Sequence, residues 1–497
     1  MMSSSLSRRV VTGVIAIVLG QAAGLIFQVA GSVILARRLG PTEFGTFAMV
    51  LFLIALMHVL SDFGQGTVLV QRPQEPRAGE WRTAFTVQLI GAASMALLLQ
   101  ALARPLARAF DLSADFVRAL AWSLPLVIVA PLERVSSAVL ERRMAYGALS
   151  IISLVGGGLQ MTVAVILAWS GFGLWSLVAG ALAAGVGRAL VSLRLARWPL
   201  GFGIERAFLG EVMKRGRYCQ LTDLLGFLRE QTPPLIAGPI FGPTAVGYLV
   251  WARNLTYVGH YIFASAFTRV GFSLMARSSE GSPSPSIGRV IEGMVSALTS
   301  ILVVLLMLLL GLAHPVVAMV YTEKWAPALP ALYLFGMRML GGGLLSLFVF
   351  LANGMGQFRL ASRTVAAWAA LEVGLALVLA PRLGFSGIAA ASALAVWPPA
   401  FWLARRVNAL LSRRGARLRF GEMVGKPVII GGIVGGVLHG LSPHISSLAE
   451  LIAAAALGSA VYVLAVGGWS EIGEPFFRHL RVWPSNSPRV ISPLEQE

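Results

Sequence analysis

Ionisable and polar side chains occur within stretches of this chain that are otherwise apolar enough to cross a bilayer. Such a residue at mid-membrane costs about 2.5–3.5 kcal/mol on insertion scales, so it usually faces protein or water. An arginine there stays ionised and offers paired donors that suit phosphate oxygens, whereas a carboxylate can balance that charge or take up a cation. The anion-binding candidates are Arg229, Arg253, Arg269, Arg338, Tyr257 and His260, and the candidates for charge balance or ion coupling are Asp62, Glu133, Asp223 and Glu372.

The spacing of three of these residues predicts a polar helix face. Arg253, Tyr257 and His260 follow one another at intervals of four and three within the apolar run 244–275. That spacing places them on one side of a helix, and apolar residues cover the other side. We therefore expect one side of this helix to face protein or water and the other to meet lipid or core.

A kink is expected in the preceding apolar run, 218–240. Pro233 and Pro234 lack the backbone donor that a helix needs, and each ring clashes with the preceding turn. Kinked helices with freed carbonyl groups commonly line transport cavities. Arg229 and Glu230 are adjacent and point about 100° apart on a helix, so we do not expect them to pair with each other.

Each candidate also has a plainer interpretation. Arg253 and Arg269 could lie near an interface and extend their charge into water. Glu133 and Asp223 could be structural partners of nearby basic groups. His260 could be a polar packing residue rather than a ligand.

Sequence signatures of catalysis are absent. There is no Gly-x-x-x-x-Gly-Lys-Ser/Thr loop, no Gly-x-Ser-x-Gly elbow and no His-Glu-x-x-His. The single cysteine, Cys219, excludes an intramolecular disulfide, and the six histidines show no metal-ligand spacing. The glycine runs 156–158 and 341–343 lie within apolar runs and predict close helix packing rather than phosphate binding. We therefore expect a protein that is not an enzyme and that needs no cofactor or metal.

Composition places most of the chain in lipid. Of 497 residues, 57% are hydrophobic and only 12% are charged, and the mean hydropathy is +0.77. A soluble domain could not cover that much apolar surface. The net charge of +18 would suit nucleic acid, but the basic residues fall mainly in short connections between apolar runs. The bilayer, and not nucleic acid, is the expected partner of that charge.

About fourteen apolar runs have the roughly 20 residues needed to cross a bilayer. With the N terminus inside, the cytoplasmic connections and ends carry roughly two dozen Lys and Arg and the opposite connections about seven, which is the asymmetry of the positive-inside rule. No connection is long enough for a soluble catalytic domain. The expected spans are 10–36, 46–70, 83–103, 119–140, 148–169, 173–193, 218–240, 244–275, 289–312, 329–352, 361–381, 385–404, 426–441 and 447–467.

An internal repeat divides the chain into two halves. The segments 39–45 (Leu-Gly-Pro-Thr-Glu-Phe-Gly) and 241–247 (Phe-Gly-Pro-Thr-Ala-Val-Gly) lie about 202 residues apart. A second pair, 171–173 and 384–387, follows in the same order at about 213 residues. Six predicted helices separate the members of each pair, so corresponding helices run in the same direction. This pattern indicates parallel repeats related by an axis along the membrane normal.

The segment 35–45, Leu-Ala-Arg-Arg-Leu-Gly-Pro-Thr-Glu-Phe-Gly, together with Ser-Asp-Phe-Gly at 61–64 and Gln-Arg at 71–72, resembles the Wzx-type polysaccharide-repeat flippases of the MATE-like (MOP) exporter superfamily. The resemblance extends loosely over the whole chain through helix count and the two-lobe layout. It implies an all-α polytopic membrane protein with two parallel six-helix lobes around a central cavity and two further C-terminal helices. The expected boundaries are 1–205, 206–410, 411–467 for the additional helices and 468–497 for a cytoplasmic tail.

The resemblance also implies a function and a location. It implies movement of undecaprenyl-diphosphate-linked oligosaccharide across the bacterial inner membrane for O-antigen, capsule or exopolysaccharide synthesis, with a polymerase or ligase as a possible partner. The distribution of Lys and Arg between connections separately predicts that both termini are cytoplasmic. The resemblance transfers no site residue, because the family has no universal catalytic motif. The alternatives are a multidrug or metabolite antiporter of the same superfamily, a flippase for peptidoglycan precursor, and a membrane polymerase or ligase, for which the non-cytoplasmic connections look too short.

Overall fold

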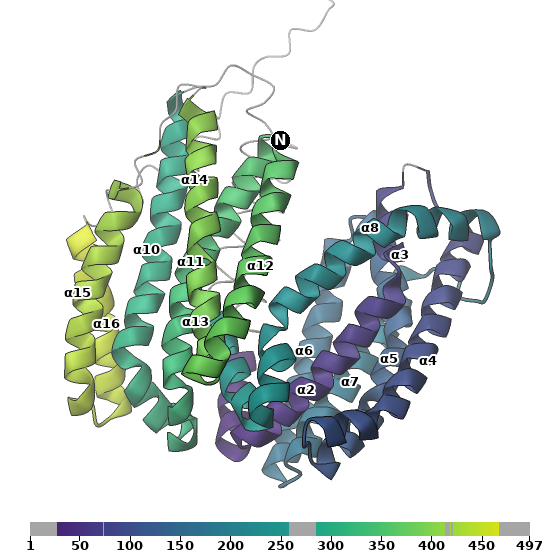
Figure 1. Ribbon diagram of the computed structural model, residues 1–497, viewed down its shortest axis with the longest axis horizontal. Helices are drawn as coiled ribbons and strands as arrows, with labels where there is room; N and C mark the ends of the chain where they lie inside the picture. The colour runs from purple at the N-terminus through teal and green to yellow at the C-terminus, as the bar shows by residue number, and fades with distance from the viewer. Residues whose placement is uncertain (1–26, 73, 258–284, 413–417, 419–420, 467–497) are drawn as a thin grey trace, which may run out of the picture. The chain divides into compact units, whose positions relative to one another are not determined.

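The computed structural model describes residues 27–72, 74–257, 285–412, 418 and 421–466 (Figure 1). Within these residues the regular structure is helical throughout and contains no strand. Twelve helical segments of the described part are long and apolar enough to cross a membrane. The chain is thus an all-α, multi-pass membrane protein. The number fourteen stays a prediction, because residues 1–26 and 258–284 lie outside the described part.

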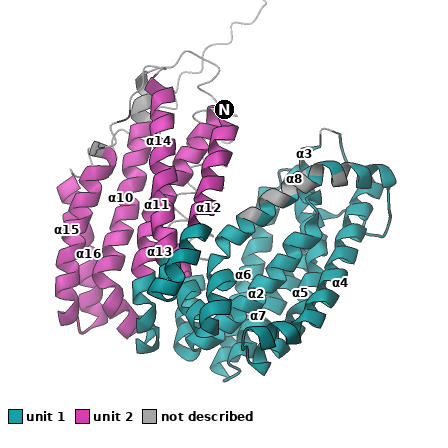
Figure 2. Cartoon of the chain, viewed as in Figure 1, with its two compact units in different colours: residues 1–252, 320–331, 373–389 teal, residues 253–319, 332–372, 390–497 magenta. Residues whose placement is uncertain are grey.

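The chain forms two compact units, shown in two colours in Figure 2. Unit 1 consists of residues 1–252, 320–331 and 373–389, and unit 2 of residues 253–319, 332–372 and 390–497. The labelled helices of the first 252 residues are α2 (Pro41–Asp62), α3 (Gln65–Gln71), α4 (Ala78–Ala109), α5 (Ala114–Arg142), α6 (Tyr146–Trp169), α7 (Leu174–Ala196), α8 (Arg206–Glu230) and the π-helical turn η1 (Pro233–Ala237). Residues 27–38 and 238–257 are also helical.

The remaining helices follow after residue 284. They are α10 (Pro285–Val316), η2 (Val317–Tyr321), η3 (Glu323–Ala328), α11 (Leu329–Gly354), α12 (Phe358–Leu383), α13 (Ser386–Ala395), α14 (Trp397–Ser412), η4 (Gly421–Gly425), α15 (Lys426–Leu441), η5 (Ser442–His444) and α16 (Leu448–Val466). Within unit 2, α10 packs on α15 and α16.

The second predicted span is two helices rather than one. The expected run 46–70 is interrupted after Asp62, where Phe63 has φ 53° and Gly64 has φ 68°. Two successive residues in the left-handed region cannot continue an α-helix, so α2 ends and the short α3 begins. Hydropathy alone gave no sign of this break. At its other end α2 begins with Pro41, and Glu43 accepts a hydrogen bond from the Gly40 amide at 2.6 Å.

The region around Pro233 confirms the expected irregularity but moves the boundaries. α8 ends at Glu230 and a π-helical turn starts at Pro233, which cannot supply the regular backbone hydrogen bond. α8 begins at Arg206, well before the predicted start at 218. The prediction followed the apolar run alone, whereas the more polar residues 206–217 are also helical. The predicted connection at 241–244 is instead helical, although Gly242 has φ 75°.

α8 packs antiparallel against α2 within unit 1. The Gln220 amide donates to the Val59 carbonyl at 2.5 Å, and the Phe227 ring stacks on Phe52 at 5.8 Å between centroids. Gly216 meets the Phe63 carbonyl oxygen so closely that any side chain there would collide with it. Glycine at 216 therefore allows α8 to reach the backbone at the break between α2 and α3.

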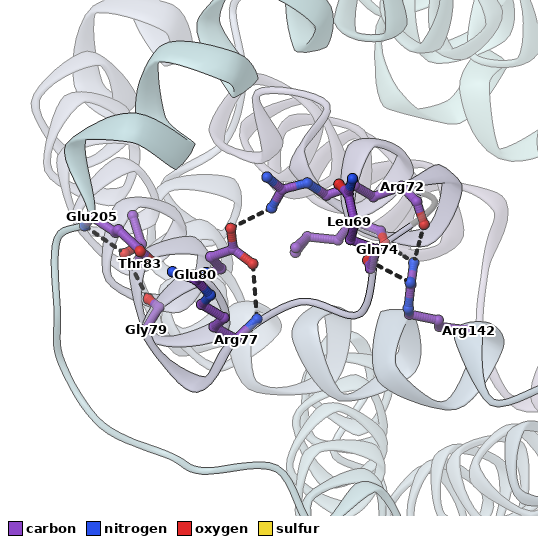
Figure 3. Close-up of polar contacts among 9 residues, drawn as sticks. All are labelled: Leu69, Arg72, Gln74, Arg77, Gly79, Glu80, Thr83, Arg142 and Glu205. Atoms are coloured by element: carbon purple, nitrogen blue, oxygen red, sulfur yellow. Dashed lines mark hydrogen bonds and ion pairs between the residues drawn. The ribbon is translucent and has the colours of Figure 1, made fainter.

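One end of unit 1 is organised by arginines that bind backbone carbonyl groups (Figure 3). The Arg142 guanidinium at the end of α5 donates to the carbonyls of Leu69 at 2.9 Å, Arg72 at 2.7 Å and Gln74 at 2.7 Å. Arg72 also pairs with Glu80 at the start of α4. The connection between α3 and α4 is thus held by Arg142 of α5 and by Glu80 of α4.

The same end of unit 1 holds the segment that leads to α8. The Glu205 amide donates to the Thr83 hydroxyl at 2.8 Å, as Figure 3 shows, and the Arg143 guanidinium donates to the Ala196 carbonyl at 2.6 Å. Trp198 is buried against Phe85 and donates its indole N–H to Ser136 at 2.9 Å. The segment 197–205 is therefore packed on the end of α4 and α5.

Candidate functional site

Two ion pairs connect three helices within unit 1. Arg134 Nη1 lies 3.4 Å from Asp62 Oδ1, joining α5 to α2, and Arg188 Nε lies 3.1 Å from Glu133 Oε2, joining α7 to α5. Glu133 and Arg134 are adjacent on α5 and point to different neighbours, as the directions of successive side chains on a helix favour. Each acid thereby offsets a charge that lipid would penalise.

Polar side chains surround Asp62 at the point where α2 ends. The Gln88 amide of α4 donates to Asp62 Oδ1 at 3.0 Å, and Gln88 is itself almost fully buried. His58, one turn earlier on α2, contacts the Leu126 carbonyl of α5 through Nε2 at 3.2 Å. Asp62 therefore lies in a polar network built by α2, α4 and α5, beside a break in the helix.

A second network lies in unit 2, around Glu372 of α12. Its carboxylate accepts a hydrogen bond from the Ser392 hydroxyl of α13 at 2.5 Å, and Oε1 lies 3.7 Å from Arg338 Nε of α11. The Arg338 guanidinium also lies over the Trp368 ring, 5.5 Å from its centroid. The side chain of Glu372 is only 3% exposed and that of Arg338 13%. At 3.7 Å the pair is held by charge rather than by a hydrogen bond.

The other predicted residues are placed differently. Arg229 pairs with Glu230, so the expectation that these neighbours would not pair was wrong. Two long side chains can converge beyond the helix surface even when their Cβ atoms diverge. Arg253 is half-buried and Tyr257 is exposed on the helix 238–257, and Asp223 is exposed on α8. His260 and Arg269 lie outside the described residues.

Sequence reasoning missed several residues of these networks. Arg188, Gln88 and Ser392 each bind one of the predicted acids. For Arg188, the signal in the sequence was the glycine at 156. A methyl group at that position would lie 2.5 Å from the Arg188 Cγ atom. Gly156 thus makes room for a charged side chain of α7, as the packing role expected for it requires, whereas Gly158 of the same run has no close neighbour.

Both networks pair arginines with carboxylates. An arginine held by one carboxylate can bind a phosphate if that carboxylate is protonated or binds a cation. Among the described residues, no three His, Cys, Asp or Glu side chains gather as metal ligands.

Solved structures of other proteins have a similar fold. The lipid II flippase MurJ, in an inward closed conformation, matches with a TM-score of 0.76 and 12% identity over 94% of this chain and 100% of that chain. An inward-facing multidrug resistance MATE family transporter of the MOP superfamily matches with a TM-score of 0.62 and 15% identity over 78% and 96%. This chain therefore has the fold of the MOP-superfamily membrane transporters.

The family follows from sequence. The family model described as "Polysaccharide biosynthesis protein" matches residues 34–330, more than half of the chain. The chain belongs to this polysaccharide biosynthesis protein family. The succinoglycan biosynthesis transport protein ExoT of Rhizobium meliloti (strain 1021) is 26% identical over 332 residues, which are 65% of each protein. The chain thus spans just under two thirds of the length of that relative. The Wzx-type resemblance drawn from residues 35–72 is confirmed.

Proposed function

We propose that this protein is a flippase that moves undecaprenyl-diphosphate-linked oligosaccharide repeat units from the cytoplasmic to the periplasmic leaflet of the inner membrane. The observation that carries the proposal is membership of the polysaccharide biosynthesis protein family on a MOP transporter fold. The kinship with a protein named for succinoglycan transport supports a polysaccharide precursor as cargo.

The charged networks give this proposal a mechanism. A diphosphate headgroup is anionic, and arginines inside the membrane-spanning part would bind it. Among the described arginines of this set that have an acidic partner in the ion pairs given above, Arg338 has the more buried partner, Glu372, which could be neutralised by a proton or a cation. Arg229, Arg253, Arg269, Tyr257 and His260 complete the proposed polar wall. Asp62, Glu133 and Asp223 serve as further sites of charge balance or coupling.

Transport would proceed by alternating access. The two repeats rock about a central site that opens first to the cytoplasm and then to the periplasm. The sugar and the diphosphate pass through the polar interior while the prenyl chain stays in lipid. Both termini are proposed to be cytoplasmic, in line with the distribution of Lys and Arg between connections. A polymerase or ligase would then take the repeat unit on the periplasmic side.

Deletion of the gene in its host tests the function. We expect surface polysaccharide to be lost and single lipid-linked repeat units to accumulate on the cytoplasmic side of the inner membrane. Plasmid-borne wild type should restore polymer, and the Glu372→Ala variant at equal protein level should restore less than a tenth of it. Unchanged polymer in the deletion strain, with no second copy of the gene, would overturn the proposal.

Two alternatives give different outcomes in the same strain. A peptidoglycan-precursor flippase would leave surface polysaccharide intact and cause cell lysis or accumulation of the peptidoglycan precursor. A multidrug antiporter would leave both polymers intact and increase sensitivity to cationic drugs. The excess of basic over acidic candidates in the second half of the chain favours an anionic cargo over a cationic drug.

A further inference from the structure

The chain between α7 and α8 presents two different sides to its surroundings. Residues 201, 203 and 205 are partly covered, whereas Leu200, Phe202 and Ile204 are exposed. A period of two is the pattern of an extended chain, and Glu205 has extended dihedrals, with φ −103° and ψ 104°. Residues 199–206, hereafter the 199–206 segment, therefore have one covered side and one exposed side.

The covered side is attached to the first turns of α4. The Gly203 amide donates to the Thr86 hydroxyl at 3.1 Å. The Glu205 amide donates to the Thr83 hydroxyl at 2.8 Å, as Figure 3 shows. A methyl group at Gly203 would lie 3.3 Å from the Arg82 Cβ atom, so glycine lets the chain lie close against the helix. The backbone of the segment is thus held on α4 at alternate residues.

The exposed side carries three large apolar side chains in a row. The exposed fraction is 52% for Leu200, 73% for Phe202 and 64% for Ile204. The Phe202 ring lies against Phe85 of α4, with 5.9 Å between centroids, so its position is fixed although most of its surface is open. Neighbouring apolar side chains held at a surface mark a place that meets lipid or another protein.

The position of the segment on α4 favours lipid as its partner. Thr83, Thr86, Ile90 and Leu97 follow one another at intervals of three, four and seven, so they lie on one side of the helix. Ile90 and Leu97 are 57% and 74% exposed on a helix long and apolar enough to span the membrane, so this side of α4 meets lipid. The segment covers the same side where the apolar run begins, which is the level of the lipid headgroups.

The charges of the segment fit an anionic surface. Arg206 continues the exposed side of the alternation beyond Ile204. At the other end of the apolar row, the Arg82 side chain of α4 donates through Nε to the Pro199 carbonyl at 3.4 Å. The acid of the segment, Glu205, is turned toward α4, where its Oε2 would lie 3.0 Å from a methyl group at Gly79. An arginine therefore stands at each end of the apolar row.

This end of unit 1 is proposed to face the cytoplasm. It contains the connection between α3 and α4, the end of α5 with Arg142 and Arg143, and the segment that leads to α8. These connections are rich in arginine, and the positive-inside rule assigns such connections to the cytoplasmic side. The cytoplasmic leaflet has a negative surface potential, because it contains anionic phospholipids. The charge of the lipid and the charge of the protein are therefore complementary here.

We propose that the 199–206 segment is a docking site for anionic phospholipid of the cytoplasmic leaflet. Its three exposed apolar side chains enter the boundary between headgroups and acyl chains, and Arg82 and Arg206 bind lipid phosphates. The segment spans the expected boundary between the two repeats, so bound lipid holds that connection at the membrane surface and against α4. The docking site uses the proposed topology but goes beyond the transport function, because it needs no cargo.

Depth-dependent fluorescence quenching tests the contact with lipid. Cys219→Ser removes the sole cysteine, and Ile204→Cys, which keeps the other two apolar side chains, is labelled with bimane. Leu97→Cys is the control for the acyl-chain region, and Glu75→Cys, exposed in the connection between α3 and α4, is the control for water. The labelled proteins are reconstituted into vesicles of phosphatidylcholine and phosphatidylglycerol. Some of the lipids carry a nitroxide near the headgroup or near the end of the chain.

We expect the nitroxide near the headgroup to quench the label at position 204 at least twofold more than the nitroxide near the chain end. The order should be reversed at position 97. Iodide in the water should quench the label at position 75 at least threefold more than the label at position 204. Quenching at position 204 by iodide as strong as at position 75, with none by either lipid, would overturn the docking site and leave a soluble protein as the partner of this surface.

Hydrogen exchange tests the preference for anionic lipid. Exchange of the amides of residues 200–205 is measured in vesicles of phosphatidylcholine alone and of phosphatidylcholine mixed with phosphatidylglycerol. We expect at least fivefold slower exchange with phosphatidylglycerol, and Arg206→Gln should remove most of that difference. Arg118→Gln is the matched control and should retain the difference, because Arg118 is exposed near the other end of α5. Equal exchange of the unsubstituted protein in the two lipids would overturn the preference for anionic lipid.

The apolar contribution is tested in the same vesicles. Phe202→Ser removes the most exposed of the three apolar side chains, and we expect exchange to become at least threefold faster in both lipids. Unchanged exchange would show that the ring makes no contact with lipid. Neither measurement uses the cargo. A deletion strain that keeps its polysaccharide would therefore reject the flippase and leave the docking site intact, and the reverse results would reject the docking site alone.

Discussion

Arg134 on α5 and Asp62 on α2 form an ion pair, with Nη1 and Oδ1 3.4 Å apart, at the residue where α2 stops. The side chain of Asp62 is 14% exposed and that of Arg134 39%, so the acid is the more deeply enclosed partner. Asp62 also accepts from Gln88, which leaves its charge satisfied from two helices. The pair thus joins the break in α2 to α5.

Removing one partner of this ion pair should lower the stability of the protein more than removing both. Arg134→Gln leaves the Asp62 carboxylate without its cation, and breaking an enclosed pair costs about 3–5 kcal/mol, reduced here to about 1–3 kcal/mol by the exposure of Arg134. The double variant Asp62→Asn/Arg134→Gln should regain at least half of that loss. Thermal unfolding of the purified protein in detergent measures all three, and additive losses in the double variant would contradict the coupling.

Gly156 and Gly158 provide a matched pair of substitutions on α6. A methyl group at Gly156 would lie 2.5 Å from Arg188 Cγ, whereas one at Gly158 would meet nothing within 4 Å. We expect Gly156→Ala to displace Arg188 from Glu133 and to lower stability by about 1–3 kcal/mol, in the range for overpacking. Gly158→Ala should be neutral or stabilise by about 0.5–1 kcal/mol, because alanine suits a helix better. Equal melting temperatures in the two variants would be evidence against the contact.

Glu372 should matter for both stability and transport, whereas Ser392 should matter mainly for stability. Glu372→Gln keeps an acceptor for the Ser392 hydroxyl but removes the charge that balances Arg338. We expect polymer synthesis to fall at least tenfold at equal protein level. Ser392→Ala removes one hydrogen bond to a charged group, a loss of about 1.5–3 kcal/mol, and should leave most transport intact. Polymer yields and fluorescence-detected melting curves separate the two effects.

Arg142 should control the order of the connection between α3 and α4. Its guanidinium reaches several backbone carbonyls of residues 69–74 at once, and a lysine cannot reproduce that fork. In Arg142→Lys we expect faster hydrogen exchange and faster proteolysis in residues 69–77. Arg118→Ala is the control, because Arg118 pairs with Asp115 at the surface. The exposed fraction of the side chain is 65% for Arg118 and 53% for Asp115. Unchanged exchange in Arg142→Lys would assign the order of this connection to other contacts.

Local backbone chemistry explains which elements were predictable. Pro233 and Pro234 produce an irregular turn whatever the surrounding tertiary structure, because proline has no backbone N–H to donate. The break at Phe63 and Gly64 was not predictable, because a non-glycine residue at φ 53° is uncommon and is held there by its surroundings. Gly216 of α8, packed on the Phe63 carbonyl, belongs to those surroundings and is distant in sequence.

The sequence by itself indicated that lipid surrounds most of the chain, that the chain is helical, that it contains an internal repeat and which family it resembles. Each of these rests on local composition, on spacing along one helix, or on two short segments that match in order. The same information placed ionisable residues in the membrane, since the charge of Asp62, Glu133, Arg338 and Glu372 is visible in the chain alone.

Only the tertiary structure decided which charges meet. Asp62 pairs with Arg134, Glu133 with Arg188 and Glu372 with Arg338, and each pair joins different helices. Such partners depend on how helices far apart in sequence pack, and helical periodicity gives a face but not the neighbour it meets. The repeat segments show the same division. Their similarity is written in the sequence, but the contact of Thr42 with Thr244 exists because packing brings both backbones together, where only glycine leaves room.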